Sequence, residues 1–367
     1  MEFRKDKFMK KLKFSQKERL ERLRKKRRRS DLRRRNYLYS GERYLISMPE
    51  AFNLSSECAD TLACIQEIKK IGNNPEGRQS VIQIDFSKTK WASAAAMLVL
   101  NAEIDRIMSR HPTKVRLIAS RLGDWAAHVV MRLEQLGFFD LIGIELGVRW
   151  PDEWRHEEVT VLPMIACNKL DPARVQRIRT RLEQVANVLE QGPELYEAMI
   201  EATGNAVDHA YPEDEGYNFS PLDGKPWWAT GVFSASRAEV SVVVFDQGVG
   251  IPATLNRWHL AERVRSILGV SSIMSSLVKD HARMIAAALE VSRTSKGSAM
   301  GRGQGLTDVI SPVEGYGKGR VRILSGAGGI IYTPNQEVEL FSLPRHIGGT
   351  LIEWSLPVEI QAERQAS

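Results

Sequence analysis

Several features that would place a chain in a familiar class are scarce or missing from this sequence of 367 residues. Cysteine occurs only three times, at Cys58, Cys64 and Cys167, each in an apolar context. An odd number of apolar cysteines predicts buried thiols and a reducing, cytoplasmic location. No Cys/His group has the spacing of a zinc site. No apolar run approaches the ~18 residues that a transmembrane helix needs, and the basic N-terminus lacks the apolar segment of a secretory signal.

Positive charge is concentrated at the N-terminus. Residues 1–36 hold 18 Lys and Arg against five acidic residues, a net of +13, whereas the whole chain carries +7. The rest is therefore mildly acidic, at −6. Such dense like charge predicts that residues 1–40 form a disordered tail. The tail either contacts a nucleic acid, contacts a membrane surface or acidic protein, or only solubilises the chain.

Residues 41–150 alternate between apolar strands and amphipathic helices, which predicts a layered α/β domain. Gly137 is expected to end the last helix, because glycine favours the conformation found after helix C-termini. The predicted strands are 44–48, 81–86 and 114–119, and the predicted helices are 55–71, 93–109 and 124–136.

Part of this domain resembles a STAS domain, the fold of anti-sigma-factor antagonists. The resemblance is carried by VIQIDFSKTKWASAAAMLVL at 81–100, VRLIAS at 115–120 and QLGFFDLI at 135–142. That family carries an Asp-Ser-Ser/Thr-Gly motif whose first serine is phosphorylated. This chain has Ala92-Ser93-Ala94-Ala95 instead, so Ser93 either caps its helix or is a regulated phosphorylation site.

The segment ELYEAMIEATGNAVDHAY, at 194–211, reads as one helix. Glu201, Asn205 and His209 are spaced i, i+4, i+8, so they share one face. An adjoining apolar stripe can pack on a sheet; it consists of Leu195, Met199, Ala202, Ala206 and Ala210. The carboxylate could polarise a water or hydroxyl, the amide could hold a metal, and the imidazole could reach a phosphate.

Two later motifs fit this helix. In VSVVVFDQGVGIP, at 240–252, a continuous apolar strand ends at Asp246, and Gly248 and Gly250 follow. The carboxylate can accept a hydrogen bond from an exocyclic amine, and the glycines let the backbone approach a flat ring. In GRGQGL, at 301–306, Gly301, Gly303 and Gly305 precede a helix whose N-terminus can bind phosphate.

Other segments connect these motifs. Residues 151–192 are expected to form a connector with a strand at VTVLPMI and an Arg/Glu-rich helix over 172–190. Residues between Pro252 and Gly301 are expected to form a lid that contains a long helix over 261–289. Lys296 and Arg302 either neutralise phosphate charge or are solvated lid charges.

The order and spacing of the three motifs resemble the GHKL ATPase superfamily, over about residues 174–356. The resemblance implies a Bergerat-type α/β sandwich at 193–357, followed by a short tail at 358–367, with ATP and Mg²⁺ as ligands. It implies that Glu201 activates the attacking water or hydroxyl, that Asn205 coordinates Mg²⁺, and that Asp246 recognises adenine. It implies that Thr350 supports Asp246 and adenine through a water. The remaining residues would line the nucleotide or its metal shell: Asp208, His209, Gly248, Gly250, Gly301, Gly303 and Gly305.

We therefore expect a Mg-ATP-binding regulatory protein that hydrolyses ATP slowly and uses its nucleotide state to control partner docking or dimerisation. One alternative is a serine/threonine kinase of the anti-sigma type. Another is a nucleic-acid-associated or defence-type effector subunit in which ATP is a structural sensor. A conventional histidine kinase is not expected, because His111, His128 and His156 do not lie in a long two-helix segment. No transducer domain is expected after Trp354, which disfavours a chaperone or topoisomerase.

Overall fold

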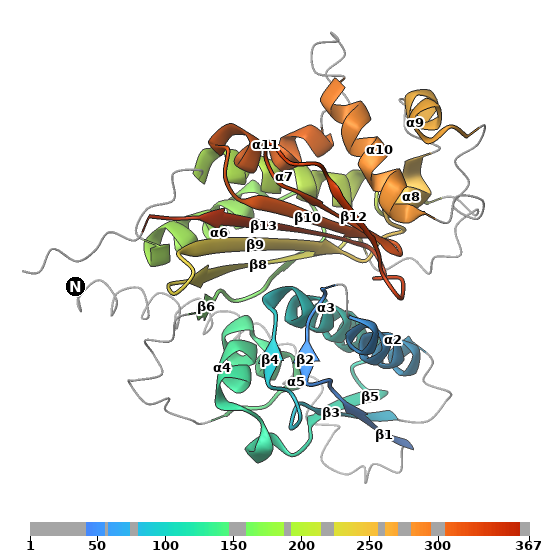
Figure 1. The fold of residues 1–367 in the computed structure, drawn as a ribbon. Coiled ribbons are helices and arrows are strands. Elements are labelled where there is room, and N and C mark those ends of the chain that lie inside the picture. Colours follow the sequence, from blue (N-terminus) through green and yellow to red (C-terminus); the bar gives the residue numbers. More distant parts are fainter. Residues whose placement is uncertain are drawn as a thin grey trace, which may run out of the picture.

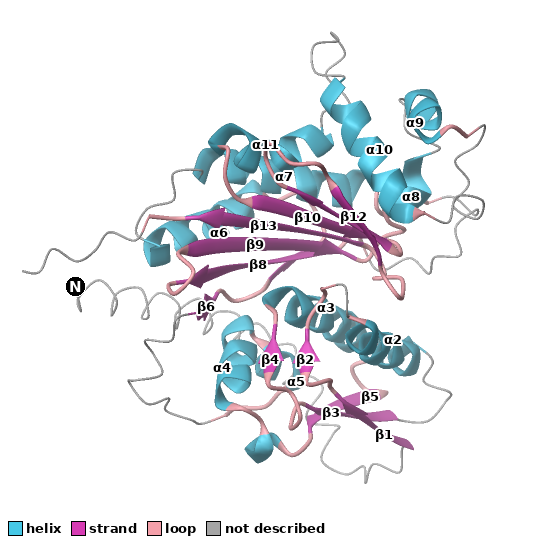
Figure 2. Cartoon of the chain, viewed as in Figure 1, coloured by secondary structure: helices cyan, strands magenta, loops and turns pink. Residues whose placement is uncertain are grey.

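The computed structural model describes residues 42–55, 58–73, 80–146, 159–186, 192–213, 224–255, 261–270, 280–294 and 305–359. The fold is mixed α/β (Figures 1 and 2). None of the helices in these ranges is long and apolar enough to cross a membrane. The basic tail lies outside the described residues.

The N-terminal part contains a parallel sheet of three strands in the order β1-β3-β5. The strands are β1 (Glu42–Ser47), β3 (Ser80–Asp85) and β5 (Val115–Ala119). A small parallel pair is formed by β2 (Ala51–Phe52) and β4 (Trp91–Ala92). The helices are α2 (Ala59–Asn73), α3 (Ala94–Arg110), α4 (Ala127–Leu136) and α5 (Phe138–Ile142), and a 3-10 turn, η1, covers Leu122–Asp124.

The C-terminal part contains an eight-stranded sheet in the order β12-β11-β10-β13-β9-β8-β6, with β7 also paired to β8. Its neighbouring strands are antiparallel. The strands are β6 (Val159–Val161), β7 (Ile165–Cys167), β8 (Trp227–Ser234), β9 (Glu239–Asp246), β10 (Arg320–Ser325), β11 (Gly328–Tyr332), β12 (Glu339–Ser342) and β13 (Thr350–Pro357). The helices are α6 (Pro172–Ala186), α7 (Gly192–Asp208), α8 (Ile251–Thr254), α9 (Ala261–Leu268), α10 (His281–Thr294) and α11 (Gly305–Tyr316).

Both faces of this sheet are covered, which explains why β9 is apolar from Val242 to Phe245. Val242 and Val244 pack into the core formed with α6, α7 and α11. Val243 and Phe245 point to the opposite face and join the core built around α3. Because successive side chains of a strand alternate between the two faces, a strand buried on both sides must be continuously apolar. Figure 1 shows α7 and α11 above the sheet and α2 and α3 below it.

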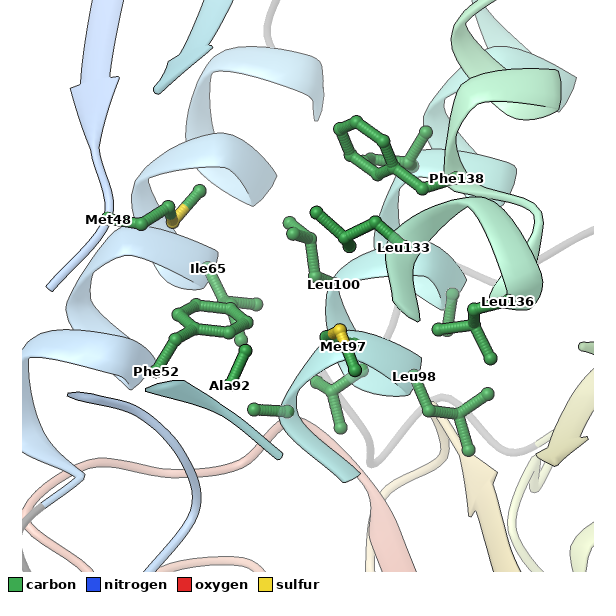
Figure 3. Close-up of a cluster of buried hydrophobic side chains, with 14 of the residues drawn as sticks. Met48, Phe52, Ile65, Ala92, Met97, Leu98, Leu100, Leu133, Leu136 and Phe138 are labelled. Atoms are coloured by element: carbon green, nitrogen blue, oxygen red, sulfur yellow. The ribbon is translucent and has the colours of Figure 1, made fainter. Parts of the chain in front are cut away.

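The core of the N-terminal part is continuous with the lower face of the large sheet. Figure 3 shows its aliphatic and aromatic centre, in which Phe52, Leu100 and Phe138 are fully buried. The same cluster includes Trp228 and Leu351 of the large sheet. The two predicted domains therefore share one hydrophobic cluster, and their predicted boundaries remain a prediction.

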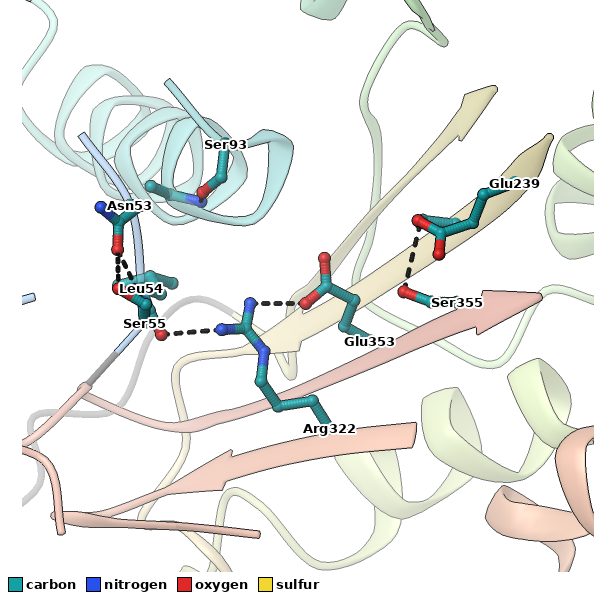
Figure 4. Close-up of polar contacts among 10 residues, drawn as sticks. Asn53, Leu54, Ser55, Ser93, Glu239, Arg322, Glu353 and Ser355 are labelled. Atoms are coloured by element: carbon teal, nitrogen blue, oxygen red, sulfur yellow. Dashed lines mark hydrogen bonds and ion pairs between the residues drawn. The ribbon is translucent and has the colours of Figure 1, made fainter. Parts of the chain in front are cut away.

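Two polar contacts fix the sheet against the N-terminal part. The indole Nε1 of Trp228 donates a hydrogen bond to Asp105 Oδ2 over 2.9 Å. Arg322 on β10 donates to the carbonyl oxygen of Leu54 over 2.8 Å and pairs with Glu353 (Figure 4). The Trp228–Asp105 and Arg322–Leu54 bonds each join residues more than 100 positions apart in the sequence.

Most predicted elements are confirmed. Gly137 ends α4 with φ of +96°, as expected for a glycine in this position. Ser93 caps α3, because its Oγ accepts a hydrogen bond from the Ala96 N–H over 3.2 Å. The single strand predicted at VTVLPMI is instead two short strands, β6 and β7, separated by residues 162–164 that include Pro163.

The long helix predicted over 261–289 is wrong. α9 ends at Leu268, and Gly269 follows with φ of +67°, a left-handed conformation that helices do not continue through. α10 begins only at His281, and residues 271–279 lie outside the described residues. The apolar periodicity of the two helices concealed the break at the glycine.

We expect Trp228→Phe to lower the free energy of unfolding by about 1–3 kcal/mol, because it removes a buried donor and leaves the Asp105 carboxylate without it. Chemical denaturation followed by circular dichroism measures the change. The matched control is Trp91→Phe, since Trp91 is 42% exposed whereas Trp228 is 2% exposed. Equal effects of the two substitutions would contradict this role for Trp228.

Candidate functional site

The polar face of α7 presents the residues singled out in the sequence. Leu195, Met199 and Ala202 are buried on the opposite side of the helix, which leaves Glu201 and Asn205 half-buried, while Asp208 and His209 are exposed. α7 ends at Asp208, so His209 lies just beyond it, with its N–H donating to the Asn205 carbonyl oxygen over 3.0 Å.

The surroundings of Glu201 disfavour the charged form of its carboxyl group. Burial raises the pKa of this carboxyl, and the nearby carboxylate of Asp308 raises it further. A hydrogen bond from the Asn205 side chain and the charge of His209 act in the opposite direction, but the net shift of the Glu201 pKa is upward. A carboxyl with a raised pKa and an adjacent amide is suited to accept a proton during a reaction near neutral pH.

Asp308 is a site residue that the sequence analysis missed. It lies in the first turn of α11, the helix that begins at Gly305 and packs against α7. An acidic residue three positions after the last glycine of GRGQG was a usable signal, but the spacing alone did not show that it faces Glu201.

Asp246 lies at the C-terminal end of β9 and pairs with Thr350 at the start of β13. Its side chain is 8% exposed. Burial raises the pKa of Asp246 to about 7, although the backbone N–H groups of Gly248 and Thr350 counteract this. The Gly248 N–H donates to Asp246 Oδ1 over 2.8 Å. A buried carboxyl with unused acceptor capacity can bind a hydrogen-bond donor of a ligand.

The loop after β9 packs directly on the end of α7. The Val249 N–H donates to the Ala210 carbonyl oxygen over 2.9 Å. A Cβ atom on Gly248 would lie 2.3 Å from that same oxygen, so only glycine fits here. The Tyr211 hydroxyl accepts the Gln247 N–H over 2.8 Å and donates to the Pro226 carbonyl oxygen. Tyr211 closes the predicted helix segment, yet its role as a clamp could not be read from the sequence.

A pair of hydroxyl groups supports the other side of this loop. Gly250 has φ of +85° and precedes α8. The Ile251 N–H donates to Ser325 Oγ over 2.8 Å, and Ser325 Oγ lies 2.9 Å from Thr350 Oγ1. Thr350 thus supports the Asp246 loop through Ser325. Like Asp308, Ser325 was not identified from the sequence.

The structure brings the predicted residues into two groups, one beside α7 and one just beyond its C-terminal end. Glu201 and Asn205 form the first group with Asp308, and Asp246, Gly248, Gly250 and Thr350 form the second beside Ala210. α7 runs on for seven positions from Glu201 to its last residue, Asp208, which corresponds to about 10 Å along the helix axis, and Ala210 follows two positions later. Gly305 begins α11. Lys296, Gly301, Arg302 and Gly303 lie outside the described residues.

Within the described ranges, no group of three or more His, Cys, Asp or Glu side chains is arranged to hold a metal ion. Asn205 offers one amide oxygen beside the carboxyl of Glu201. That donor set fits a hard cation such as Mg²⁺, which keeps several waters and takes the remaining oxygens from a bound phosphate.

No protein-family model and no curated protein matches the chain.

The raised pKa of Asp246 makes stability depend on pH in a defined direction. Between about pH 4 and pH 7 the folded protein keeps a proton on Asp246 that the unfolded chain has released, so the free energy of unfolding falls as the pH rises. Asp246→Asn should remove this component, which amounts to roughly 4 kcal/mol at most.

Urea denaturation of the wild type and the variant across this pH range measures the difference. Asp60→Asn, at an exposed position in the first turn of α2, serves as the control and should leave the pH profile unchanged. Parallel profiles for the wild type and Asp246→Asn would show that the Asp246 pKa is not raised.

Proposed function

We propose that this protein binds Mg-ATP in a GHKL-type site, hydrolyses it slowly, and uses its nucleotide state to regulate a partner or its own dimerisation. The N-terminal part would be a STAS-like module. The observation that carries the proposal is the arrangement on α7: a carboxyl–amide pair faces the N-terminal turn of α11, and a buried carboxyl lies beside the other end of the same helix.

Asp246 would bind the adenine ring. Its carboxyl is buried at the strand end, where a donor such as the exocyclic amine of adenine can replace water as its partner. Because its pKa is about 7, an amine donor would favour the charged form, and ATP binding near neutral pH would release a proton. Gly248 and Gly250 let this loop pack tightly, because a Cβ would lie 2.3 Å from the carbonyl oxygen of Ala210 at Gly248 and 2.9 Å from Ser325 Oγ at Gly250.

The phosphates would lie toward the other end of α7. Successive backbone N–H groups at the start of α11 can bind phosphate oxygens, and α11 packs on α7 beside Glu201 and Asn205. Asn205 would hold Mg²⁺ together with phosphate oxygens and waters. Glu201 would accept a proton from the attacking water, which its raised pKa favours.

The regulatory part of the proposal is supported by the contact between α3 and the strand that ends at Asp246. α3 packs on β8 and β9, so a change at the end of β9 adjoins the N-terminal part directly. A partner protein, a homodimer and a nucleic acid bound through residues 1–36 remain predictions. Light scattering with and without a non-hydrolysable ATP analogue tests dimerisation.

Glu201→Gln should reduce ATP hydrolysis by at least about 100-fold, because it removes the proton acceptor while it keeps the size of the side chain. Binding of ATP should persist, since Glu201 is not assigned to adenine. Turnover is measured as ADP and free phosphate, with binding followed by calorimetry.

The matched control is Glu197→Gln, which alters an exposed glutamate one turn earlier on α7 and should leave turnover unchanged. Full hydrolysis by Glu201→Gln would refute the assigned mechanism. Protein-bound phosphate, detected by intact mass after incubation with Mg-ATP, would instead favour the serine kinase alternative over simple hydrolysis.

A further inference from the structure

Two histidines from separate elements meet beside the turn between β10 and β11. His281 is the first residue of α10, and His346 lies in the loop between β12 and β13. Their ring centroids are 6.3 Å apart, and the ring planes are almost perpendicular, at 88°. We call these two residues the histidine pair. Neither was singled out in the sequence, because the contact joins positions that are distant along the chain.

Both rings accept a hydrogen bond from a backbone N–H group. His281 Nδ1 accepts the Ala327 N–H over 2.9 Å, and His346 Nδ1 accepts the Gly348 N–H over 3.0 Å. A ring nitrogen that accepts carries no proton, so each neutral imidazole holds its proton on Nε2. A second proton would go to Nδ1 and turn the acceptor into a donor that faces another donor. Protonation of either ring therefore breaks its bond to the backbone.

His128 shows the opposite arrangement. Its Nε2 lies 2.8 Å from the carbonyl oxygen of Lys90. A carbonyl oxygen only accepts, so the ring donates to it in the neutral and in the charged form alike. Acid should therefore leave the His128 bond in place while it removes both bonds of the histidine pair.

The bond from Ala327 to His281 ties the first turn of α10 to the sheet. Gly326 has φ of +64°, and a Cβ atom on it would lie 2.4 Å from His281 Nδ1. The Ile347 N–H donates to the Gly326 carbonyl oxygen over 2.8 Å, and the Leu343 N–H donates to the Ala327 carbonyl oxygen over 2.9 Å. The turn is thus bonded on one side to α10 and on the other to the loop that carries His346.

The charges around the pair also disfavour protonation. Partial burial lowers the pKa of both imidazoles. Asp280 raises the pKa of His281, whereas His281 and Lys69 on α2 lower the pKa of His346. Arg345 adds a positive charge next to His346 in the sequence, and the turn at 326–327 carries no charged side chain. A cation at the N-terminus of α10 is unfavourable as well.

We propose that the histidine pair is a pH-operated latch: the neutral rings hold the start of α10 on the β10–β11 turn, and protonation of both rings releases it. Two charged rings at this separation also repel each other, so protonation of one opposes protonation of the other. The latch does not rest on the proposed nucleotide site and operates without a ligand.

The direction of the pH dependence follows from the lowered pKa values. The unfolded chain takes up protons at the ordinary histidine pKa of about 6.5, above the values in the folded protein. The stabilisation by the latch is therefore complete above about pH 6.5 and is lost as the pH falls through the folded pKa values. Asp246 changes global stability in the opposite direction, so the latch requires a local measurement.

The test is residue-resolved hydrogen exchange of the full chain without nucleotide, at about pH 7.5 and about pH 5. Each rate is divided by the intrinsic rate of an unprotected amide at the same pH. Protection of the Ala327 amide should fall at least about 10-fold at the lower pH. Equal protection of Ala327 at both pH values would overturn the proposal.

His281→Asn separates titration from hydrogen bonding. The asparagine Oδ1 can replace Nδ1 as an acceptor but does not titrate, so Ala327 should stay protected at both pH values. The matched control, His128→Asn, should lose Ala327 protection in acid as the wild type does. A wild-type loss in His281→Asn, or loss of protection at both pH values with an unchanged circular dichroism spectrum, would overturn the latch.

His346→Asn tests whether the two rings act as a pair. This variant keeps an acceptor for the Gly348 N–H but removes one of the two charges. Protonation of His281 then meets less repulsion, so the midpoint of Ala327 release should move to a higher pH than in the wild type. A midpoint at the wild-type pH would show that the rings titrate independently and would overturn the paired latch.

Discussion

The loop after β9 approaches the end of α7 so closely that its first glycine has no room for a side chain. A Cβ on Gly248 would lie 2.3 Å from the Ala210 carbonyl oxygen, and the Val249 N–H donates to that oxygen over 2.9 Å. Tyr211 binds the same loop through the Gln247 N–H. This contact fixes Asp246 relative to the polar face of α7. α7 carries Glu201 and Asn205, and the residues that follow it directly, Ala210 and Tyr211, hold the loop after Asp246, so the spacing of the two groups is fixed.

The large sheet connects this site to the rest of the molecule. Its upper face packs against α7 and α11, and its lower face packs against α3, so β9 contributes to two cores at once. Residues 245–247 contact both sides of the sheet: Phe245 packs in the core built around α3 and Gln247 donates to Glu103 on α3, whereas the carboxyl of Asp246 is buried at the strand end. The proposed regulation by nucleotide would act through this short segment, because it joins Asp246 to α3.

The sequence predicted those features that depend on local pattern. The stripe through Leu195, Met199 and Ala202 predicted the buried side of α7, and the continuous valines predicted an apolar strand that ends at Asp246. It did not predict the roles of Tyr211, Ser325 or Asp308, because each acts through a partner distant in the chain. The break at Gly269 was missed because apolar periodicity continues across it. The GHKL and STAS resemblances themselves remain predictions, as does every role assigned to residues 296–303.

The proposed nucleotide site depends most on recognition of the adenine amine by the carboxyl of Asp246. ATP and inosine triphosphate test it most directly, because they differ at position 6 of the base, where inosine carries an oxygen in place of the amine. An acceptor facing that position should bind ATP at least about 10-fold more tightly, since the inosine oxygen leaves the buried carboxyl without a donor. Calorimetric titration of the full chain with each nucleotide and Mg²⁺ gives the ratio. Equal affinities, or no binding of ATP, would contradict the account.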